Sequence, residues 1–271
     1  MKKAHSLALV AAGRIRGSFL ARLPGLAEHL GPVKGSSFRL ASRVANILRA
    51  GYPVRHYGDL KAAGTILIRV PDCQLRATVE ELALVPLQWD SASVVLCDSE
   101  LDAGELSLLA ERGAAVASLS TVPGQDDQRL LVEGSRAAVA GLRKTLEPHG
   151  VRLIEVECGS KALCLAGLAF AGMFCAPLLA AADRCLQGAG LPAHEASRLL
   201  EASFEKSLRG YLKAGRNAIP AARGAQAAIQ RQLAALRRHN PELAQVFADA
   251  DAAVARMRSG SERWLARAAA G

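Results

Sequence analysis

Short apolar runs alternate with amphipathic stretches through about the first 157 residues of the chain. Apolar runs of this length that are bounded by Gly, Pro, Asp or Ser are typical of β-strands. The predicted strands are residues 7–10, 65–70, 93–97, 115–119, 130–133 and 151–156. Helical patterns lie between them at residues 73–84, 102–112 and 135–149. This alternation predicts a parallel, doubly wound α/β sheet.

The pattern changes after residue 157, where helical patterns follow one another without strand patterns between them. An uncharged stretch over residues 162–182 comes first. The further helical patterns cover residues 194–213, 226–238, 242–258 and 261–270. We therefore predict two domains, an α/β domain over residues 1–157 and an all-α domain over residues 158–271.

Two apolar segments also match patterns of membrane targeting. A basic start before apolar residues 7–12 resembles a signal peptide, but the run is short and arginines follow it, which favours a first β-strand. The uncharged stretch 162–182 is long enough to cross a bilayer. It is rich in Ala and Gly and contains Pro177, so we favour a buried central helix and keep a membrane span as the alternative.

The composition is that of a basic globular protein. Hydrophobic residues make up 51% of the chain and charged residues 22%, which excludes general disorder. The net charge of +9 favours anionic partners such as phosphates. The alternative is an ordinary solvated surface that is rich in arginine and binds no particular ligand. The six cysteines show no C-x-x-C spacing and the six histidines no metal-ligand spacing. We expect reduced, buried cysteines, no bound metal and a cytoplasmic location.

A glycine-bearing turn follows the first predicted strand. Its sequence is Ala11-Ala12-Gly13-Arg14-Ile15-Arg16-Gly17. A dinucleotide-binding turn has three glycines, for the tight turn, for close approach of the backbone to the pyrophosphate and for helix packing. Ala11, Gly13 and Arg16 stand at these positions, so the glycine with the strictest steric demand is present. We predict a Rossmann-type turn in which Ala11 and Gly13 contact the cofactor and Arg14 faces the pyrophosphate.

The segment expected to contact the adenosine ribose lies about 20 residues further on. It reads Val33-Lys34-Gly35-Ser36-Ser37-Phe38-Arg39 and contains no carboxylate. A carboxylate would bind the ribose diol of NAD, whereas hydroxyls and an arginine suit a 2′-phosphate. Ser36, Ser37 and Arg39 therefore predict NADP(H) in preference to NAD(H). The alternative is that these residues form a solvated loop and helix start.

Several short strings give the whole chain a family resemblance. They are Gly13-Arg14, Val70-Pro71-Asp72, Ser99, Arg112-Gly113-Ala114 before Ser118-Leu119, Lys161-Ala162-Leu163 and Arg223-Gly224. In order and spacing the chain resembles a family of Rossmann-type proteins with an N-terminal NAD(P)-binding domain and an all-α C-terminal domain of unknown function. This family is related to the phosphogluconate-dehydrogenase-like group, which includes pyrroline-5-carboxylate reductase and the deazaflavin-dependent NADP reductases.

The resemblance implies roles for several of these residues. It places Val70 and Pro71 at the cofactor, and Ser99 and Lys161 as candidate catalytic residues. Ser99 would line the nicotinamide end, but it equally suits the start of a helix. Lys161 would meet substrate or cofactor at an interdomain cleft, or it is simply an interfacial lysine at the end of an apolar helix. Arg223-Gly224 would reach an anionic group or mark a turn between helices.

Polar residues of the family pattern are repeatedly absent from this chain. The residues found in their places are Cys97, Ser120, Cys164, Leu165, Gly172, Met173 and Ala225, and Glu100 and Thr121 replace a glycine and a proline of the pattern. The family has histidines at three of these places, and an apolar replacement cannot act as a general acid or base. The fold is expected to be retained while much of the polar site is lost.

Three functions remain open. The first is an NAD(P)-dependent oxidoreductase that transfers hydride to a small, unidentified substrate, with NADP(H) or NAD(H) supplying the chemistry. The second is a non-catalytic relative that binds a dinucleotide or acts as a scaffold. The third is an anion-binding protein, but scattered C-terminal arginines with few aromatics argue against nucleic-acid binding. We expect a homodimer through the C-terminal helices, as in the related group, and no membrane partner.

Overall fold

The computed structural model describes residues 6–13, 15–23, 25–122, 128–215 and 226–268, with side chains as far as residue 257. The chain divides into two compact units, Met1–Gly172 and Met173–Gly271, and each is described by itself. The division falls later than the boundary predicted after residue 157, because helix α6 (Lys161–Ala171) belongs to the first unit.

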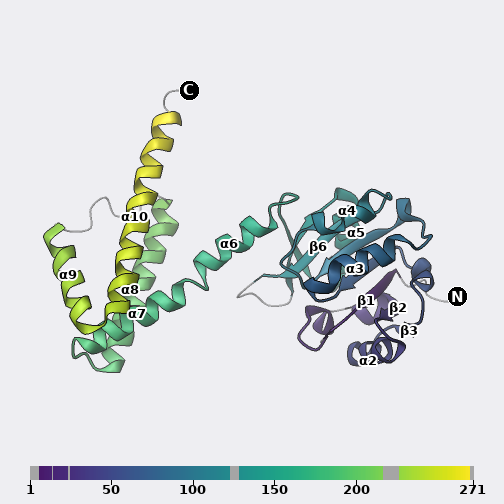
Figure 1. Cartoon of the computed structure of the whole chain (residues 1–271), viewed down its shortest axis with the longest axis horizontal. Helices are drawn as coiled ribbons and strands as arrows, with labels where there is room; N and C mark the ends of the chain where they lie inside the picture. The colour runs from purple at the N-terminus through teal and green to yellow at the C-terminus, as the bar shows by residue number, and fades with distance from the viewer. Residues whose placement is uncertain (1–5, 14, 24, 123–127, 216–225, 269–271) are drawn as a thin grey trace. The chain divides into compact units, whose positions relative to one another are not determined.

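The first unit is built on one eight-stranded sheet (Figure 1). Its strand order is β3-β2-β1-β4-β5-β6-β7-β8. The strands are β1 (Leu7–Ala11), β2 (Leu30–Gly35), β3 (Tyr52–Val54), β4 (Thr65–Arg69), β5 (Ser93–Cys97), β6 (Ala115–Thr121), β7 (Arg129–Gly134) and β8 (Arg152–Glu155). All neighbouring strands are parallel except β6 and β7, which are antiparallel. The doubly wound α/β sheet is therefore confirmed, with one antiparallel exception.

The chain reverses its direction of winding at β1. This strand pairs with β2 on one side and with β4 on the other, and Ala11 at its end lies opposite Gly35 and Arg69. In open parallel sheets, ligands bind at the carboxyl ends of the strands where the strand order reverses. The topology therefore predicts a ligand site among the loops that follow β1, β2, β4 and β5.

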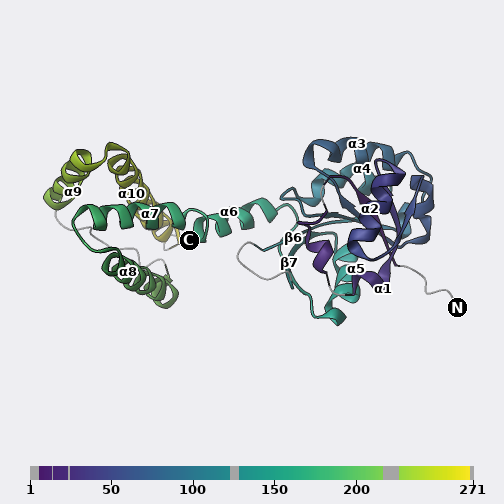
Figure 2. The same ribbon diagram turned by 90° about the horizontal axis from the view of Figure 1, so that it is seen from below.

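Two apolar cores hold helices against the two faces of this sheet (Figure 2). One core joins the sheet to α2 (Phe38–Leu48) and α5 (Arg136–Leu146). The other joins it to α3 (Asp72–Ala83) and α4 (Ser107–Ala110). Five 3₁₀ helices complete the connections: η1 (Phe19–Arg22), η2 (Tyr57–Ala62), η3 (Trp89–Ser91), η4 (Ala103–Leu106) and η5 (Glu147–His149).

The connection after β1 differs from the predicted helix start. It contains only the 3₁₀ helix η1 and the four-residue helix α1 (Leu26–His29) before β2 begins. Gly25, the N-cap residue of α1, separates the two segments, since its φ of +74° lies outside the right-handed helical region. The long first helix of a Rossmann unit is therefore replaced by two short helical segments.

Other helix predictions also need correction. The expected helix 102–112 is divided into η4 and α4, and Asp72 is the first residue of α3, with Pro71 as its N-cap. Of the six cysteines, only Cys97 is buried, whereas Cys73 and Cys158 are exposed. The prediction that the cysteines are buried is thus wrong for the others, although none of the six forms a disulfide in the structure.

The second unit is helical. It contains α7 (Cys175–Gly188), α8 (Ala193–Ala214), α9 (Gln226–His239) and α10 (Pro241–Ala268). The patterns at residues 242–258 and 261–270 thus belong to one continuous helix.

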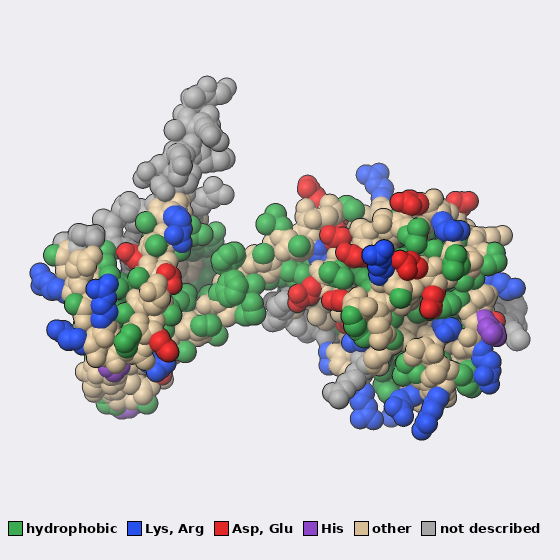
Figure 3. All heavy atoms as spheres, viewed as in Figure 1, with side chains coloured by type: hydrophobic (Ala, Val, Ile, Leu, Met, Phe, Trp, Pro, Cys, Tyr) green, Lys and Arg blue, Asp and Glu red, His purple; other side chains and the backbone are tan. Residues whose placement is uncertain are grey.

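The uncharged stretch after residue 161 is not the buried central helix that we favoured. It is divided into α6 and α7, which are separated by residues 172–174, and its most apolar window is not buried in the structure. Figure 3 shows hydrophobic side chains exposed along α6. By length and composition alone, Lys161–Gly188 qualifies as a candidate membrane span, which is weak evidence because core helices of soluble proteins meet the same test.

The antiparallel pair β6–β7 depends on a glycine. Gly134 has a φ of +140°, and a Cβ there would lie 2.5 Å from Ala117 Cα. We expect Gly134→Ala to lower the free energy of unfolding by about 3 kcal/mol, because it combines an unfavourable φ with a backbone clash. Gly141→Ala is the control, since a Cβ there meets nothing within 4 Å in α5. It should stabilise the protein by about 0.5–1 kcal/mol. Urea unfolding of both variants checks this, and equal stability would contradict it.

Candidate functional site

The turn after β1 packs directly against the end of β4. Ala12 N donates a hydrogen bond to Arg69 O at 3.0 Å. Gly13 has a φ of +73°, and a Cβ there would lie 3.2 Å from Pro71 Cγ and 3.7 Å from Arg69 Nη1. Both the backbone conformation and the close neighbours therefore require glycine at this position. Ala11 is buried in β1, and Arg14 lies outside the described residues.

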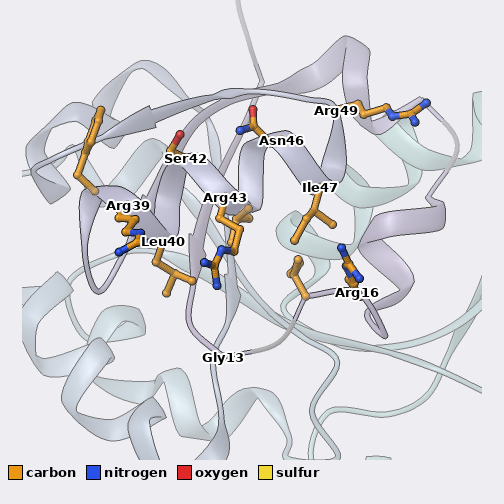
Figure 4. A pocket seen from close by; sticks show the side chains of 12 residues that line it. Gly13, Arg16, Arg39, Leu40, Ser42, Arg43, Asn46, Ile47 and Arg49 are labelled. Atoms are coloured by element: carbon orange, nitrogen blue, oxygen red, sulfur yellow. The ribbon is translucent and has the colours of Figure 1, made fainter.

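A cavity of about 1010 Å³ opens between this turn and helix α2 (Figure 4). Its lining includes Gly13 and four arginines, which are Arg16, Arg39, Arg43 and Arg49. The guanidinium group of Arg43 points from α2 toward Gly13, whereas that of Arg49 points away (Figure 4). No carboxylate is among the twelve lining residues. The cavity is therefore suited to an anionic ligand.

Of the three residues predicted to bind the 2′-phosphate, Ser36, Ser37 and Arg39, only Arg39 lines the cavity. Ser36 and Ser37 are exposed after β2, and Ser37 Oγ caps α2 by accepting a hydrogen bond from Leu40 N at 3.2 Å. Sequence reasoning missed Arg43, although its spacing of four residues from Arg39 places both on one face of a helix. Arg16, which stands at the third glycine position of the pattern, also lines the cavity.

An ion pair joins the ends of β4 and β5. Arg69 Nε lies 3.5 Å from Asp98 Oδ2, and Arg69 Nη1 donates a hydrogen bond to Ala12 O at 3.4 Å. Asp98 also accepts hydrogen bonds from Ser18 Oγ and from Phe19 N. Val70 is buried, and Pro71, the N-cap residue of α3, lies beside Gly13. Of the two predicted cofactor contacts after β4, Pro71 therefore lies against the turn.

Lys161 is fully buried at the beginning of α6. Its Nζ donates hydrogen bonds to Ser99 O at 2.6 Å, to Ser118 Oγ at 2.7 Å and to Leu101 O at 3.1 Å. The three protons of an ammonium group are therefore all used. Ser99 is also buried, and its Oγ donates to Asp72 Oδ1 at 3.1 Å. The two predicted catalytic residues do come together, but each is bound to other protein groups.

Glu133 carries the negative charge that acts most strongly on Lys161. Its side chain is fully buried, and its carboxylate accepts hydrogen bonds from Ala103 N and Gly159 N, each at 2.5 Å. Burial lowers the pKa of Lys161, and the charge of Glu133 opposes this shift. Burial likewise raises the pKa of the Cys97 thiol, with the Asp98 charge acting in the same direction. A thiol with a raised pKa is a poor nucleophile, so Cys97 is a packing residue.

The described residues contain no group of three or more His, Cys, Asp or Glu side chains that could hold a metal ion. Arg223-Gly224, which the resemblance placed near an anionic group, lies outside the described residues.

Comparisons with known proteins agree with this architecture. Residues 129–253 match a family model described as "Domain of unknown function (DUF2520)". No curated protein matches the chain at a significant level.

Solved structures share the fold over nearly the whole chain. An imine reductase from Myxococcus stipitatus in complex with NADP+ is 18% identical, with a TM-score of 0.64, covering 95% of this chain and 94% of that one. An imine reductase from Aspergillus terreus is 20% identical, with a TM-score of 0.65 and 96% coverage of both chains. A reductive aminase from Aspergillus terreus in complex with NADPH and ethyl-5-oxohexanoate is 19% identical, with a TM-score of 0.62, covering 95% and 94%. The predicted Rossmann-type sheet followed by helices, and the family resemblance in fold, are confirmed.

Replacing Lys161 tests its role as a buried anchor. Lys161→Met should lower the free energy of unfolding by about 3–5 kcal/mol, because it leaves three buried acceptors without their donor and removes the positive charge that acts on the buried Glu133. Lys144→Met, which removes an exposed lysine from α5, should change stability by less than about 0.5 kcal/mol. Urea unfolding at neutral pH measures both, and a Lys161→Met protein as stable as the control would contradict the assignment.

The same residue makes stability depend on pH. Because the pKa of Lys161 is lower in the folded protein than the ordinary value of 10.5, the unfolded chain binds more protons between the two pKa values. The free energy of unfolding should therefore rise with pH in that interval, below about 10.5. The Lys161→Met protein should lack this contribution when the two pH profiles are subtracted.

Proposed function

We propose that the chain binds NADP(H) in preference to NAD(H) and acts as an oxidoreductase on a small, unidentified substrate. The observation that carries this proposal is the cavity beside the β1 turn, where Gly13 is bordered by Arg39 and Arg43 from α2. It lies at the reversal point of strand order, where folds of this class bind dinucleotides.

The charges of the cavity favour a phosphorylated cofactor. Arginine binds phosphate oxygens through a planar set of donors, and such charge-assisted hydrogen bonds are among the stronger ones in proteins. The 2′-phosphate that distinguishes NADP from NAD would meet Arg39 and Arg43 near the end of β2. Solved structures of this fold hold NADP+, NADPH or, in one variant, NAD+, which supports a dinucleotide site, whereas the preference for NADP(H) rests on the arginines.

The chain's own residues would position the cofactor. Gly13 allows close approach of the backbone, Pro71 borders the turn, and Arg39 and Arg43 bind the adenosine end. Ser99 and Lys161, linked by a 2.6 Å hydrogen bond, would border the nicotinamide end. The cofactor supplies hydride transfer when it is bound.

A non-catalytic dinucleotide-binding relative is the second candidate. Its support is that Lys161 uses all three of its donors within the protein and that Ser99 Oγ is bonded to Asp72. Groups engaged in this way are poorly placed to exchange protons with a substrate. Cofactor binding without NADPH oxidation in a screen of imines and carbonyl compounds would favour this candidate.

We also propose a homodimer formed through the C-terminal helices. On α8, the side chains of Phe204, Leu208 and Leu212 are 42%, 47% and 75% exposed and recur at intervals of four residues. Such spacing places them on one face of the helix. Exposed apolar surface of this kind is typical of protein interfaces. A cytoplasmic location and the lack of nucleic-acid or membrane partners stay predictions.

The cofactor proposal is tested by titrating the protein with NADPH and with NADH. We expect NADPH to bind at least tenfold more tightly. Arg39→Ala and Arg43→Ala should each weaken NADPH binding by about tenfold, the effect of losing one charge-assisted hydrogen bond, and change NADH binding much less. The control Arg76→Ala removes a 91% exposed side chain from α3 and should have no effect. If neither cofactor binds, or if both are weakened equally, the proposal is wrong.

The homodimer is tested by light scattering during size-exclusion chromatography. Wild type should elute with twice the mass of one chain, and Leu212→Glu should shift it toward the monomer, because a buried charge at an apolar interface is costly. Leu84→Glu is the matched control, since Leu84 is 80% exposed in the sheet unit. A monomeric wild type would refute this part of the proposal.

A further inference from the structure

Asp98 is held in an uncommon position at the end of β5. Its φ is +56°, a left-handed conformation that non-glycine residues seldom adopt. Its side chain is 13% exposed and is held by Arg69, Ser18 Oγ and Phe19 N. A negative charge is therefore fixed among the loops in which the proposed cofactor would lie.

Arg69 is the cation that connects this charge to the β1 turn. Its Nη1 bonds to Ala12 O and lies 3.7 Å from the position of a Cβ on Gly13. Its Nε is buried, lies 3.5 Å from Asp98 Oδ2 and makes no hydrogen bond among the described residues. One edge of the guanidinium group is thus held by the turn, while the other has an ion pair but an unused hydrogen-bonding capacity.

Arg69 would attract an anionic ligand, whereas Asp98 would repel it. A diphosphate that approaches Gly13 would come close to Arg69, and a guanidinium group turned away from Asp98 could donate hydrogen bonds to the phosphate oxygens. It would also come close to the Asp98 carboxylate, whose like charge is unfavourable at short range in a poorly solvated site.

We propose that Asp98 competes with the cofactor's diphosphate for Arg69 and thereby lowers the affinity for the dinucleotide. This rests on the proposed function and adds a residue that sets how tightly the cofactor is held. In the free protein Arg69 pairs with Asp98; in the complex it pairs with the diphosphate, and Asp98 remains with Ser18 and Phe19.

Asp98→Asn isolates the charge. Asparagine tolerates the left-handed conformation and can still accept a hydrogen bond from Phe19 N. We expect NADPH and inorganic pyrophosphate to bind about tenfold more tightly to this variant, by calorimetric titration at low ionic strength. Glu100→Gln removes an exposed carboxylate two residues away and should change binding less than twofold. Arg69→Gln should weaken the binding of both ligands.

Adenosine 2′-monophosphate separates this inference from the proposed function, because it carries the 2′-phosphate and lacks the diphosphate. It should bind wild type and Asp98→Asn equally. If it binds both and NADPH affinity is unchanged or weaker in Asp98→Asn, the role of Asp98 is refuted and the cofactor site stands. If adenosine 2′-monophosphate and NADPH both fail to bind wild type and Asp98→Asn, the cofactor site and the role of Asp98 are both refuted. Asp98→Gly removes the same charge and fits the same φ, so the same gain is expected should Asp98→Asn not fold.

Discussion

The burial of Lys161 and Glu133 is the constraint on which the carboxyl edge of the sheet depends. The Lys161 ammonium group donates hydrogen bonds to Ser99 O, Leu101 O and Ser118 Oγ. The Glu133 carboxylate accepts hydrogen bonds from Ala103 N and Gly159 N. These groups come from the ends or neighbouring loops of β5, β6 and α6. A buried ion is tolerated only when its charge and hydrogen bonds are satisfied. The loops after β5 are thus held by a network of buried polar groups next to the apolar cores of the sheet unit.

This network leaves the two ends of the site with different physical characters. Beside the β1 turn, exposed arginines on α2 surround an open cavity. Beside β5 and β6, the polar groups are buried and bonded to each other. The first arrangement suits the binding of a charged molecule, and the second suits rigidity. Cys97, which stands where the resembling family has a histidine, lies buried in β5 at the second end.

The sequence predicted the fold better than the site. Strands such as β4 and β5 are continuous apolar runs, so their burial on both faces is visible in the pattern. Strand β2 was missed because Gly31 and Pro32 interrupt it. The opposing charges of Lys161 and Glu133 could not be predicted, since a lysine before an apolar helix is usually an interfacial residue. Arg69 and Asp98 are 29 residues apart and meet only because β4 and β5 are neighbours in the sheet.

The short helical segments after β1 change how this fold can vary. In a Rossmann unit with a long first helix, much of the attraction for a diphosphate comes from backbone N–H groups and the helix dipole, which most side-chain substitutions leave intact. Here that helix is reduced to η1 and α1, and the positive charge comes from arginine side chains. In the proposed site, a substitution at one of these arginines would change the affinity for an anionic ligand and leave the two apolar cores intact. Ligand affinity and fold stability would then depend on different sets of residues.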